Sequence, residues 1–157
     1  MNRALLLTAL ALGAGCNSSP VSLSGSISQA FDLSFSSDQL TRNANAFQVT
    51  YLRSDGNEIV MRVTVDTTGL TIRGGLPINL AGDVTPGQPR TSVTRAVANE
   101  PLRVLPDVSN GLMTLNDNAV PGQNSSGSFG LTFAMGSALG SGYSLNGNFE
   151  GVVVAVP

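Results

Sequence analysis

The chain contains no histidine, no lysine and no tryptophan, and it has a single cysteine in 157 residues. Histidine is the side chain most often used for acid–base catalysis near neutral pH, and it is the commonest metal ligand. Its absence excludes serine–histidine and cysteine–histidine nucleophiles, and zinc sites built from cysteine and histidine. The absence of lysine removes serine–lysine pairs and Schiff-base chemistry. With one cysteine the chain cannot form an internal disulfide, so burial of apolar side chains has to stabilise the fold.

Charged residues are also scarce. They make up 11% of the chain, against a usual share of about a quarter, while hydrophobic residues at 41% are near average. All eight basic residues are arginines, spread from Arg3 to Arg103 without a cluster. Binding to nucleic acid needs grouped cations that neutralise several phosphates together, so we expect no nucleic-acid partner. Uncharged polar residues and 18 glycines take the place of charge, and they suit the turns and solvent faces of an antiparallel sheet.

The N-terminal segment has an ordered composition. Arg3 is followed by an apolar run over residues 4–12, three small residues, Cys16 and a polar stretch over residues 17–20. The apolar run fits the core of a secretory signal, roughly 7–15 residues long, and is shorter than the ~20 residues of a membrane-spanning helix. This order resembles the signal peptide and lipobox of bacterial lipoproteins over the first 20 residues. The two small residues before the cysteine match that pattern, whereas Gly13 stands where the family prefers Leu, Val or Ile.

The resemblance implies cleavage before Cys16, lipid attached to its sulfur, and acylation of the new amine. Several acyl chains together hold a protein stably on a membrane, whereas one chain alone holds it only marginally. We therefore expect a signal peptide over residues 1–15, a lipidated cysteine with a short tether over residues 16–20, and one domain over residues 21–157. In the same family an aspartate after the cysteine is linked to inner-membrane retention, and this chain has Asn17 there. The expected location is the outer membrane of a bacterial cell envelope, on either its periplasmic or its surface face.

Two other interpretations of Cys16 stay open. An ordinary signal peptidase could remove the segment, with residues 9–11 as its cleavage site. The segment could instead form a buried N-terminal helix, in which the thiol is a small apolar side chain.

Alternation of apolar and polar residues dominates the rest of the chain and predicts strands. Strands are expected in segments 21–35, 47–51, 59–65, 70–72, 76–80, 102–105, 112–115, 129–133 and 143–156. An Asp-Gly turn between the second and third of these is the strongest hairpin signal, and Pro77 makes 76–80 an edge strand. Segment 91–100 fits either a strand or a short helix. The pattern predicts an all-β fold, an antiparallel sandwich or a partly open barrel.

Two details concern the ends of this predicted sheet. Residues 152–156 are apolar at every position, which is typical of a strand covered on both faces. Segments 23–27 and 145–149 share the pattern Leu-x-Gly-x-apolar, either because strands look alike or because the first and last strands are neighbours whose glycines allow close backbone approach. The domain also loosely resembles short bacterial lipoproteins that open and close with such strands, a resemblance that carries no known activity.

The candidate chemical sites are weak. Two carboxylates are enough for a glycosidase, and Asp55 with Glu58 is the closest pair, but a hairpin tip favours a turn aspartate and a solvated glutamate. Glu150 falls on the polar face of its strand. Asn116-Asp117-Asn118 offers oxygen ligands for calcium, yet it lacks the spaced acidic pattern of a calcium loop, so an Asx turn is preferred. Gly74-Gly75 is not followed by a helix and is no phosphate loop.

The sequence therefore favours a lipid-anchored bacterial envelope protein with a non-catalytic, structural or adhesive β-sandwich domain. The lipid on Cys16 attaches it to the membrane, no cofactor or metal is expected, and its partner would be an envelope protein or a glycan. The alternative is a small-ligand or carbohydrate binder that uses loops at one end of the sandwich, such as 82–90 and 116–128. A carboxylate enzyme is the third interpretation.

Overall fold

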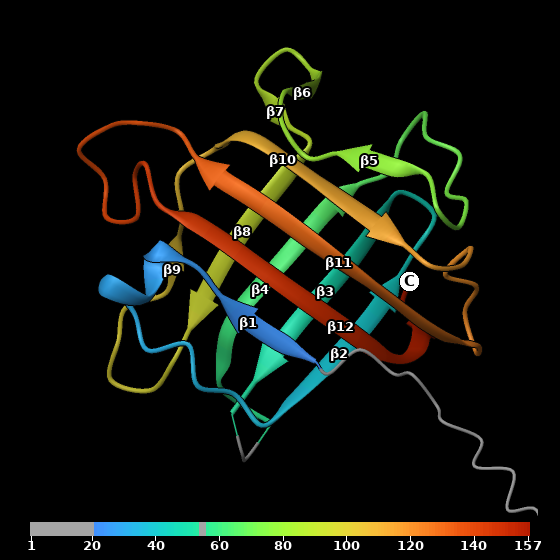
Figure 1. Cartoon of the computed structure of the whole chain (residues 1–157), viewed down its shortest axis with the longest axis horizontal. Coiled ribbons are helices and arrows are strands. Elements are labelled where there is room, and N and C mark those ends of the chain that lie inside the picture. Colours follow the sequence, from blue (N-terminus) through green and yellow to red (C-terminus); the bar gives the residue numbers. More distant parts are fainter. Residues whose placement is uncertain (1–20, 54–55) are drawn as a thin grey trace, which may run out of the picture.

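The computed structural model describes residues 21–53 and 56–157 (Figure 1). The predicted signal peptide, Cys16 and the tether lie outside these residues. The described chain forms one short 3-10 helix, η1 (Ser26–Gln29), and otherwise strands. The strands are β1 (Ser22–Ser24), β2 (Ser37–Arg42), β3 (Ala46–Leu52), β4 (Ile59–Asp66), β5 (Pro77–Asn79), β6 (Asp83–Thr85), β7 (Gln88–Pro89), β8 (Thr91–Ala96), β9 (Arg103–Val104), β10 (Val108–Leu115), β11 (Asn124–Phe133) and β12 (Ser144–Ala155). The predicted all-β class is confirmed. In this part of the chain, no helix has the length and hydropathy needed to cross a bilayer.

The main sheet curls back over itself to form two layers. Its strand order is β5-β10-β11-β12-β2-β3-β4-β8-β9, with β1 added to β12, while β6 and β7 form a separate small hairpin. In Figure 1, β10, β11 and β12 cross over β2, β3, β4 and β8. The fold is a half-barrel, the partly open form of the predicted architecture. One departure from an antiparallel sheet is the parallel pairing of β12 with β2.

Strand β12 is the corner that joins the layers. Most of its length pairs with β11, and its last residues pair with β2. Where β12 turns away from β2, the backbone N–H of Glu150 donates to Oδ2 of Asp38 at 3.0 Å. Burial raises the pKa of the Asp38 carboxyl. A carboxylate thus replaces the missing strand partner at the point where the two layers separate.

The core lies between the layers, and Tyr51 is its most connected aromatic residue. Its ring lies edge-on to Phe35 at 4.9 Å and to Phe129 at 6.3 Å between centroids. Its hydroxyl donates to the backbone carbonyl of Asn148 at 3.0 Å, which ties β3 to β12. Burial raises the pKa of Tyr51, so the hydroxyl stays protonated and serves as a donor.

Strands β1 and β12 are neighbours, as the shared Leu-x-Gly-x-apolar pattern suggested. Leu23 pairs with Gly147 in an antiparallel register. A Cβ at Gly25 would overlap the backbone oxygen of Ser144, so this glycine does allow close backbone approach. At Gly147 the reason differs, because the space is filled by the hydroxyl of Tyr51 and the ring of Phe129 and not by backbone.

Several local predictions were wrong. Segment 21–35 is not one strand, because η1 interrupts it; the side chains after η1 are still buried in alternation, without a ladder. Segment 70–72 is not a strand either, and only Ile72 of it is buried. The loop predicted over 116–128 is shorter, because β11 begins at Asn124. Segment 82–90 is not only turn but contains the β6–β7 hairpin.

Burial also departs from simple alternation in two strands. In β4, register shifts on both sides place Val60 and Met61 in the core together, whereas strict alternation would bury only one of them. In β12, the expected coverage of both faces is wrong. Val152 and Val154 are 56% and 45% exposed, because none of the described residues forms a layer outside this strand, while Val153 between them is buried.

Replacing Gly147 by alanine should destabilise the domain by about 1–3 kcal/mol, because the new methyl group overpacks the core between Tyr51 and Phe129. Gly151→Ala in the same strand is the matched control, since its Cβ would lie 3.9 Å from Leu40, an ordinary contact. Urea unfolding of both variants measures the difference. Equal effects at the two positions would contradict this account of the core.

Candidate functional site

Several connections meet at one end of the layers, which we call the loop end. It consists of residues 43–45, 67–76, 80–90 and 116–123. The backbone N–H of Thr67 donates to the carbonyl of Asn45 at 2.7 Å. Arg42 Nη1 donates to the carbonyls of Asn118 and Ala119 at 2.7 and 2.9 Å, which fixes the last connection beside the β2–β3 turn.

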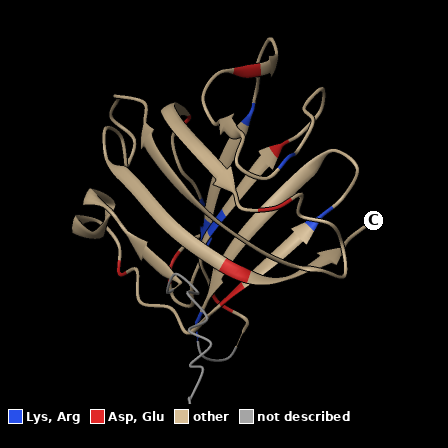
Figure 2. Cartoon of the chain, turned by 45° about the vertical axis from the view of Figure 1, so that its right-hand side comes forward, with Lys and Arg blue, Asp and Glu red and all other residues tan. Residues whose placement is uncertain are grey.

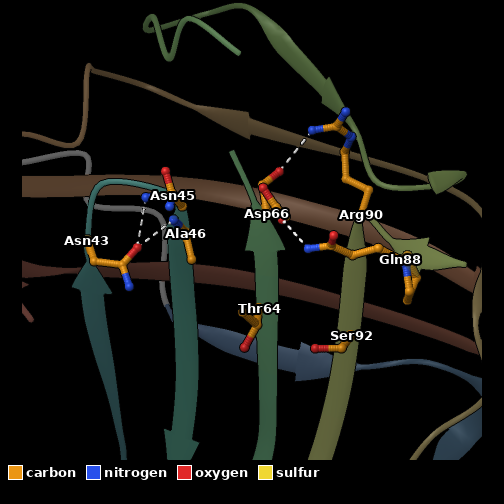
Figure 3. Close-up of a pocket in the computed structure, with 9 residues that line it drawn as sticks. Asn43, Asn45, Ala46, Thr64, Asp66, Gln88, Arg90 and Ser92 are labelled. Atoms are coloured by element: carbon orange, nitrogen blue, oxygen red, sulfur yellow. Dashed lines mark hydrogen bonds between the residues drawn. The ribbon is translucent and has the colours of Figure 1, made fainter. Parts of the chain in front are cut away.

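A cavity of about 260 Å³ opens at the loop end (Figure 3). The β2–β3 turn, the end of β4, the start of β8 and strand β7 surround it. Its lining is polar, with a single alanine and a proline among amides, hydroxyls and one residue of each charge. The lining residues are Asn43, Asn45, Ala46, Thr64, Asp66, Gln88, Pro89, Arg90 and Ser92. Segment 82–90, predicted as a binding loop, contributes to the cavity; segment 116–128 lies beside it without lining it.

Asp66 and Arg90 are held in place by backbone and side-chain hydrogen bonds. Oδ1 of Asp66 accepts from the backbone N–H of Thr68 at 2.8 Å, and Oδ2 accepts from Nε2 of Gln88 at 3.1 Å. The hydrogen bond from Thr68 is the main reason that the pKa of Asp66 is lowered, so this carboxyl is ionised at neutral pH. Arg90 Nη1 donates to the backbone oxygen of Asp66 at 2.9 Å, not to its carboxylate. One anion, at the end of β4, and one cation, between β7 and β8, therefore line the cavity.

Hydroxyl and amide groups fill the other side of the cavity. Oδ1 of Asn43 accepts from the backbone N–H groups of Asn45 and Ala46 at 2.9 and 2.7 Å, which leaves its amide nitrogen to donate elsewhere. Thr64 and Ser92 lie at paired positions of β4 and β8, and Figure 3 shows them side by side. Among the described residues, neither hydroxyl has a protein hydrogen-bond partner.

This arrangement suits recognition by hydrogen bonds. The lining offers hydrogen-bond donors and acceptors on several sides of the cavity. Within residues 21–53 and 56–157, no group of three or more acidic, cysteine or histidine side chains could hold a metal ion. A small ligand rich in hydroxyl groups is the chemical class that this lining matches.

The predicted carboxylate pair is not tested, because Asp55 lies outside the described residues. Glu58 forms an ion pair with Arg53 at 3.3 Å. Glu150 lies on the outer face of β12, where one carboxylate oxygen accepts from Nδ2 of Asn124 at 3.5 Å. The structure does not bring Glu58 or Glu150 to the loop-end cavity.

The Asn116-Asp117-Asn118 segment forms the preferred Asx turn. Oδ1 of Asp117 accepts from the backbone N–H of Ala119 at 2.7 Å, and Oδ2 accepts from that of Ser126 at 3.3 Å. Oδ1 of Asn118 accepts from the backbone N–H of Gly74 at 3.1 Å. These side-chain oxygens thus accept hydrogen bonds from nearby backbone N–H groups, as in an Asx turn. Gly74 is needed for this contact, because a Cβ there would lie 2.7 Å from a backbone oxygen of the turn.

An ion pair between a buried arginine and a partly exposed glutamate, at the opposite end of β8, was missed by the sequence analysis. Arg95 is only 1% exposed and makes two hydrogen bonds of 2.8 Å to the carboxylate of Glu100. Its Nη1 donates to the backbone oxygens of Asp32 and Val60, both at 3.1 Å, and its guanidinium lies 5.2 Å from the ring centre of Phe31. The period-two pattern of 91–95 places Arg95 on the inner face, and this was the signal available in the sequence.

Comparison of the chain with models of known protein families, with curated proteins and with solved structures finds no match. No relative therefore supplies a function, a ligand or a site residue by similarity. What the loop end and the N-terminal segment do has to follow from the residues of this chain.

Replacing Glu100 by glutamine should lower the free energy of unfolding at pH 7 by about 2 kcal/mol, because a buried guanidinium loses its counter-charge. The hydrogen bonds from Arg95 lower the pKa of Glu100 below its ordinary value of 4.5. The stabilisation is therefore complete above pH 4.5 and disappears as the pH falls through the lowered pKa.

Urea unfolding at pH 7 and at pH 3 measures this difference between wild type and E100Q. Asp107→Asn is the control, because Asp107 is exposed and its carboxylate has no protein hydrogen bond among the described residues. A difference that persists unchanged at low pH would show that the charge of Glu100 is not what stabilises the domain.

Proposed function

We propose that this chain is a lipid-anchored protein of the bacterial cell envelope with a non-catalytic, structural or adhesive β-domain. The observation that carries the proposal is the position of the only cysteine. Cys16 follows a basic residue, an apolar run and small residues, and the first strand begins at Ser22. A lone thiol at this position has an evident use as the site of lipid attachment.

The geometry of the domain fits such an anchor. Six residues from Cys16 to Ser22 span at most about 20 Å, so the lipid would hold the domain close to the bilayer. In Figure 1, strand β1 lies far from the β6–β7 hairpin, which belongs to the loop end. The anchor would therefore leave the β6–β7 hairpin free to meet a partner.

The outer face of β10, β11 and β12 supports an adhesive or structural role. These three strands carry one charged residue, Glu150, seen as a single red segment in Figure 2. Hydroxyl and amide side chains lie next to one another across the three strands of this face. For example, Ser128 of β11 pairs with Thr114 of β10 on one side and with Asn148 of β12 on the other. Such a face contacts a partner through hydrogen bonds and shape, which are less sensitive to salt than ion pairs.

Replacing Cys16 by serine should move the protein from the membrane fraction to the soluble fraction of the cell envelope, because no acyl chain can be attached. Mass spectrometry of the wild-type protein should show an N-terminal peptide that begins at Cys16 and carries acyl groups. The control is Ser18→Cys in the C16S background, in which the displaced thiol should not restore membrane association. An intact initiator methionine and an unmodified thiol in the purified wild type would refute the anchor.

A second candidate function is binding of a small ligand or carbohydrate at the loop end. The specific observation in its favour is the pair of unpartnered hydroxyls, Thr64 and Ser92, below the amide of Gln88 in one cavity. Hydroxyls and amides of this kind exchange hydrogen bonds with sugar hydroxyls. This function is compatible with the anchor, since a lipid-held domain could bind an envelope glycan.

Thr64→Val should weaken binding of a neutral oligosaccharide by roughly 10-fold, because the cavity loses a hydroxyl and buries an unpaired ligand group. The probes are soluble peptidoglycan fragments and a panel of neutral oligosaccharides, measured by titration calorimetry. Thr94→Val is the matched control, because Thr94 lies on the next strand but not in the cavity lining. Absence of binding by every probe, or equal losses in both variants, would remove this candidate.

A further inference from the structure

Asp66 and Arg90 are the two charged residues in the lining of the loop-end cavity, and hydrogen bonds to the backbone fix them to each other. The backbone N–H of Asp66 donates to the carbonyl of Arg90 at 2.7 Å, and Arg90 Nη1 donates to the carbonyl of Asp66 at 2.9 Å. The backbone N–H of Arg90 also donates to the carbonyl of Gly82 at 2.8 Å. These bonds hold an anion and a cation close together in one cavity (Figure 3).

The two charges do not neutralise each other. Within the part of the chain that the structure describes, no ion pair joins the carboxylate of Asp66 to the guanidinium of Arg90. The hydrogen bonds of both groups go to neutral partners, which are backbone groups and one side-chain amide. At the other end of β8, by contrast, Arg95 and Glu100 are in direct contact at 2.8 Å. Each charge at the loop end is therefore able to attract an opposite charge from a ligand.

Both groups also keep unused hydrogen-bonding capacity. A guanidinium has five N–H donors, and among the described residues that of Arg90 uses one of them. A carboxylate has about four acceptor positions, and the backbone N–H of Thr68 and the amide of Gln88 do not fill those of Asp66. Contacts of a guanidinium with a carboxylate, and of a carboxylate with an ammonium group, are strong charge-assisted hydrogen bonds.

The size and the lining of the cavity limit the ligand further. Its volume of about 260 Å³ is below the roughly 300–1,000 Å³ of pockets for drug-sized molecules, so it holds one small residue. Ala46 and Pro89 are its only apolar residues, which leaves no surface for a large apolar group. The unpartnered hydroxyls of Thr64 and Ser92 match a ligand that carries hydroxyl groups as well as charge.

We infer that the loop-end cavity binds a zwitterionic sugar, which carries an amino group and a carboxylate beside its hydroxyl groups. The inference rests on the second candidate function and names the class of ligand for that site. The ammonium group of the ligand contacts Asp66, its carboxylate contacts Arg90, and its hydroxyl groups contact Thr64 and Ser92. A sugar with only one of the two charges leaves the other protein charge without a partner, so complementarity of charge gives the specificity.

A set of four monosaccharides tests the two charges separately on the wild-type protein. Muramic acid carries a free amine and a carboxylate, glucosamine the amine alone, N-acetylmuramic acid the carboxylate alone, and N-acetylglucosamine neither. At about pH 6.5 the amines are protonated and the carboxylates are ionised. Titration calorimetry should show the tightest binding for muramic acid, about 10-fold weaker binding for each singly charged sugar, and the weakest binding for the neutral sugar.

Two variants assign each charge to its residue. Asp66→Asn keeps an acceptor for the N–H of Thr68 and should lower the affinity for the two sugars with a free amine by about 10-fold. Arg90→Gln should instead lower the affinity for the two sugars with a carboxylate. The matched control is Arg73→Gln, because Arg73 is exposed at the loop end but does not line the cavity; the order of affinities should not change.

The outcomes separate this inference from the proposed function. Absence of binding by all four sugars overturns the second candidate function, and this inference with it. Equal affinities for the four sugars leave a sugar site in place and overturn the zwitterionic ligand alone. An affinity that depends on the amine only, or on the carboxylate only, also overturns it, as do losses in the two variants that do not follow these groups. The comparison of ligands on the wild type decides the question even if a variant does not fold.

Discussion

The two-layered fold depends on strand β12, which belongs to both layers. Its first part closes over the core against β11, and its end pairs in parallel with β2. Gly147 lets the rings of Tyr51 and Phe129 meet beneath the strand, and the hydroxyl of Tyr51 ties the opposite layer to it. At the bend, the backbone N–H of Glu150 has no partner on β2, and the carboxylate of Asp38 accepts its hydrogen bond instead. Without these contacts the layers would have no common strand and no shared core.

This construction gives the domain two chemically different ends. At the loop end, Asp66, Arg90 and uncharged polar side chains surround an open cavity. At the other end, Arg95 is buried in an ion pair with Glu100, and the nearby surface is left to apolar side chains on β9 and the β11–β12 connection.

The sequence predicted correctly those features that are encoded by residues close together in the chain. The hairpin of β3 and β4 was predicted correctly because an Asp-Gly turn and two alternating runs lie within 20 residues. Segment 70–72 has the same alternation but no strand partner, and Val152 and Val154 look like core residues but face outward. The inner position of Arg95 followed from the period of its strand, yet its counter-charge comes from the turn beyond that strand. The loop-end cavity combines residues from four elements, of which the sequence indicated only the loop over 82–90.

The sequence by itself determined the all-β class and the chemistry that is excluded, because alternation is a local property and missing histidine and lysine cannot be replaced by folding. It also defined the N-terminal pattern on which the proposed anchor depends. Only the tertiary structure decided the parallel pairing of β12 with β2, the site formed by Thr64 and Ser92, and the exposure of Leu102 and Val104 on and beside β9. These features join segments far apart in the chain, and which faces meet depends on how the whole sheet curls.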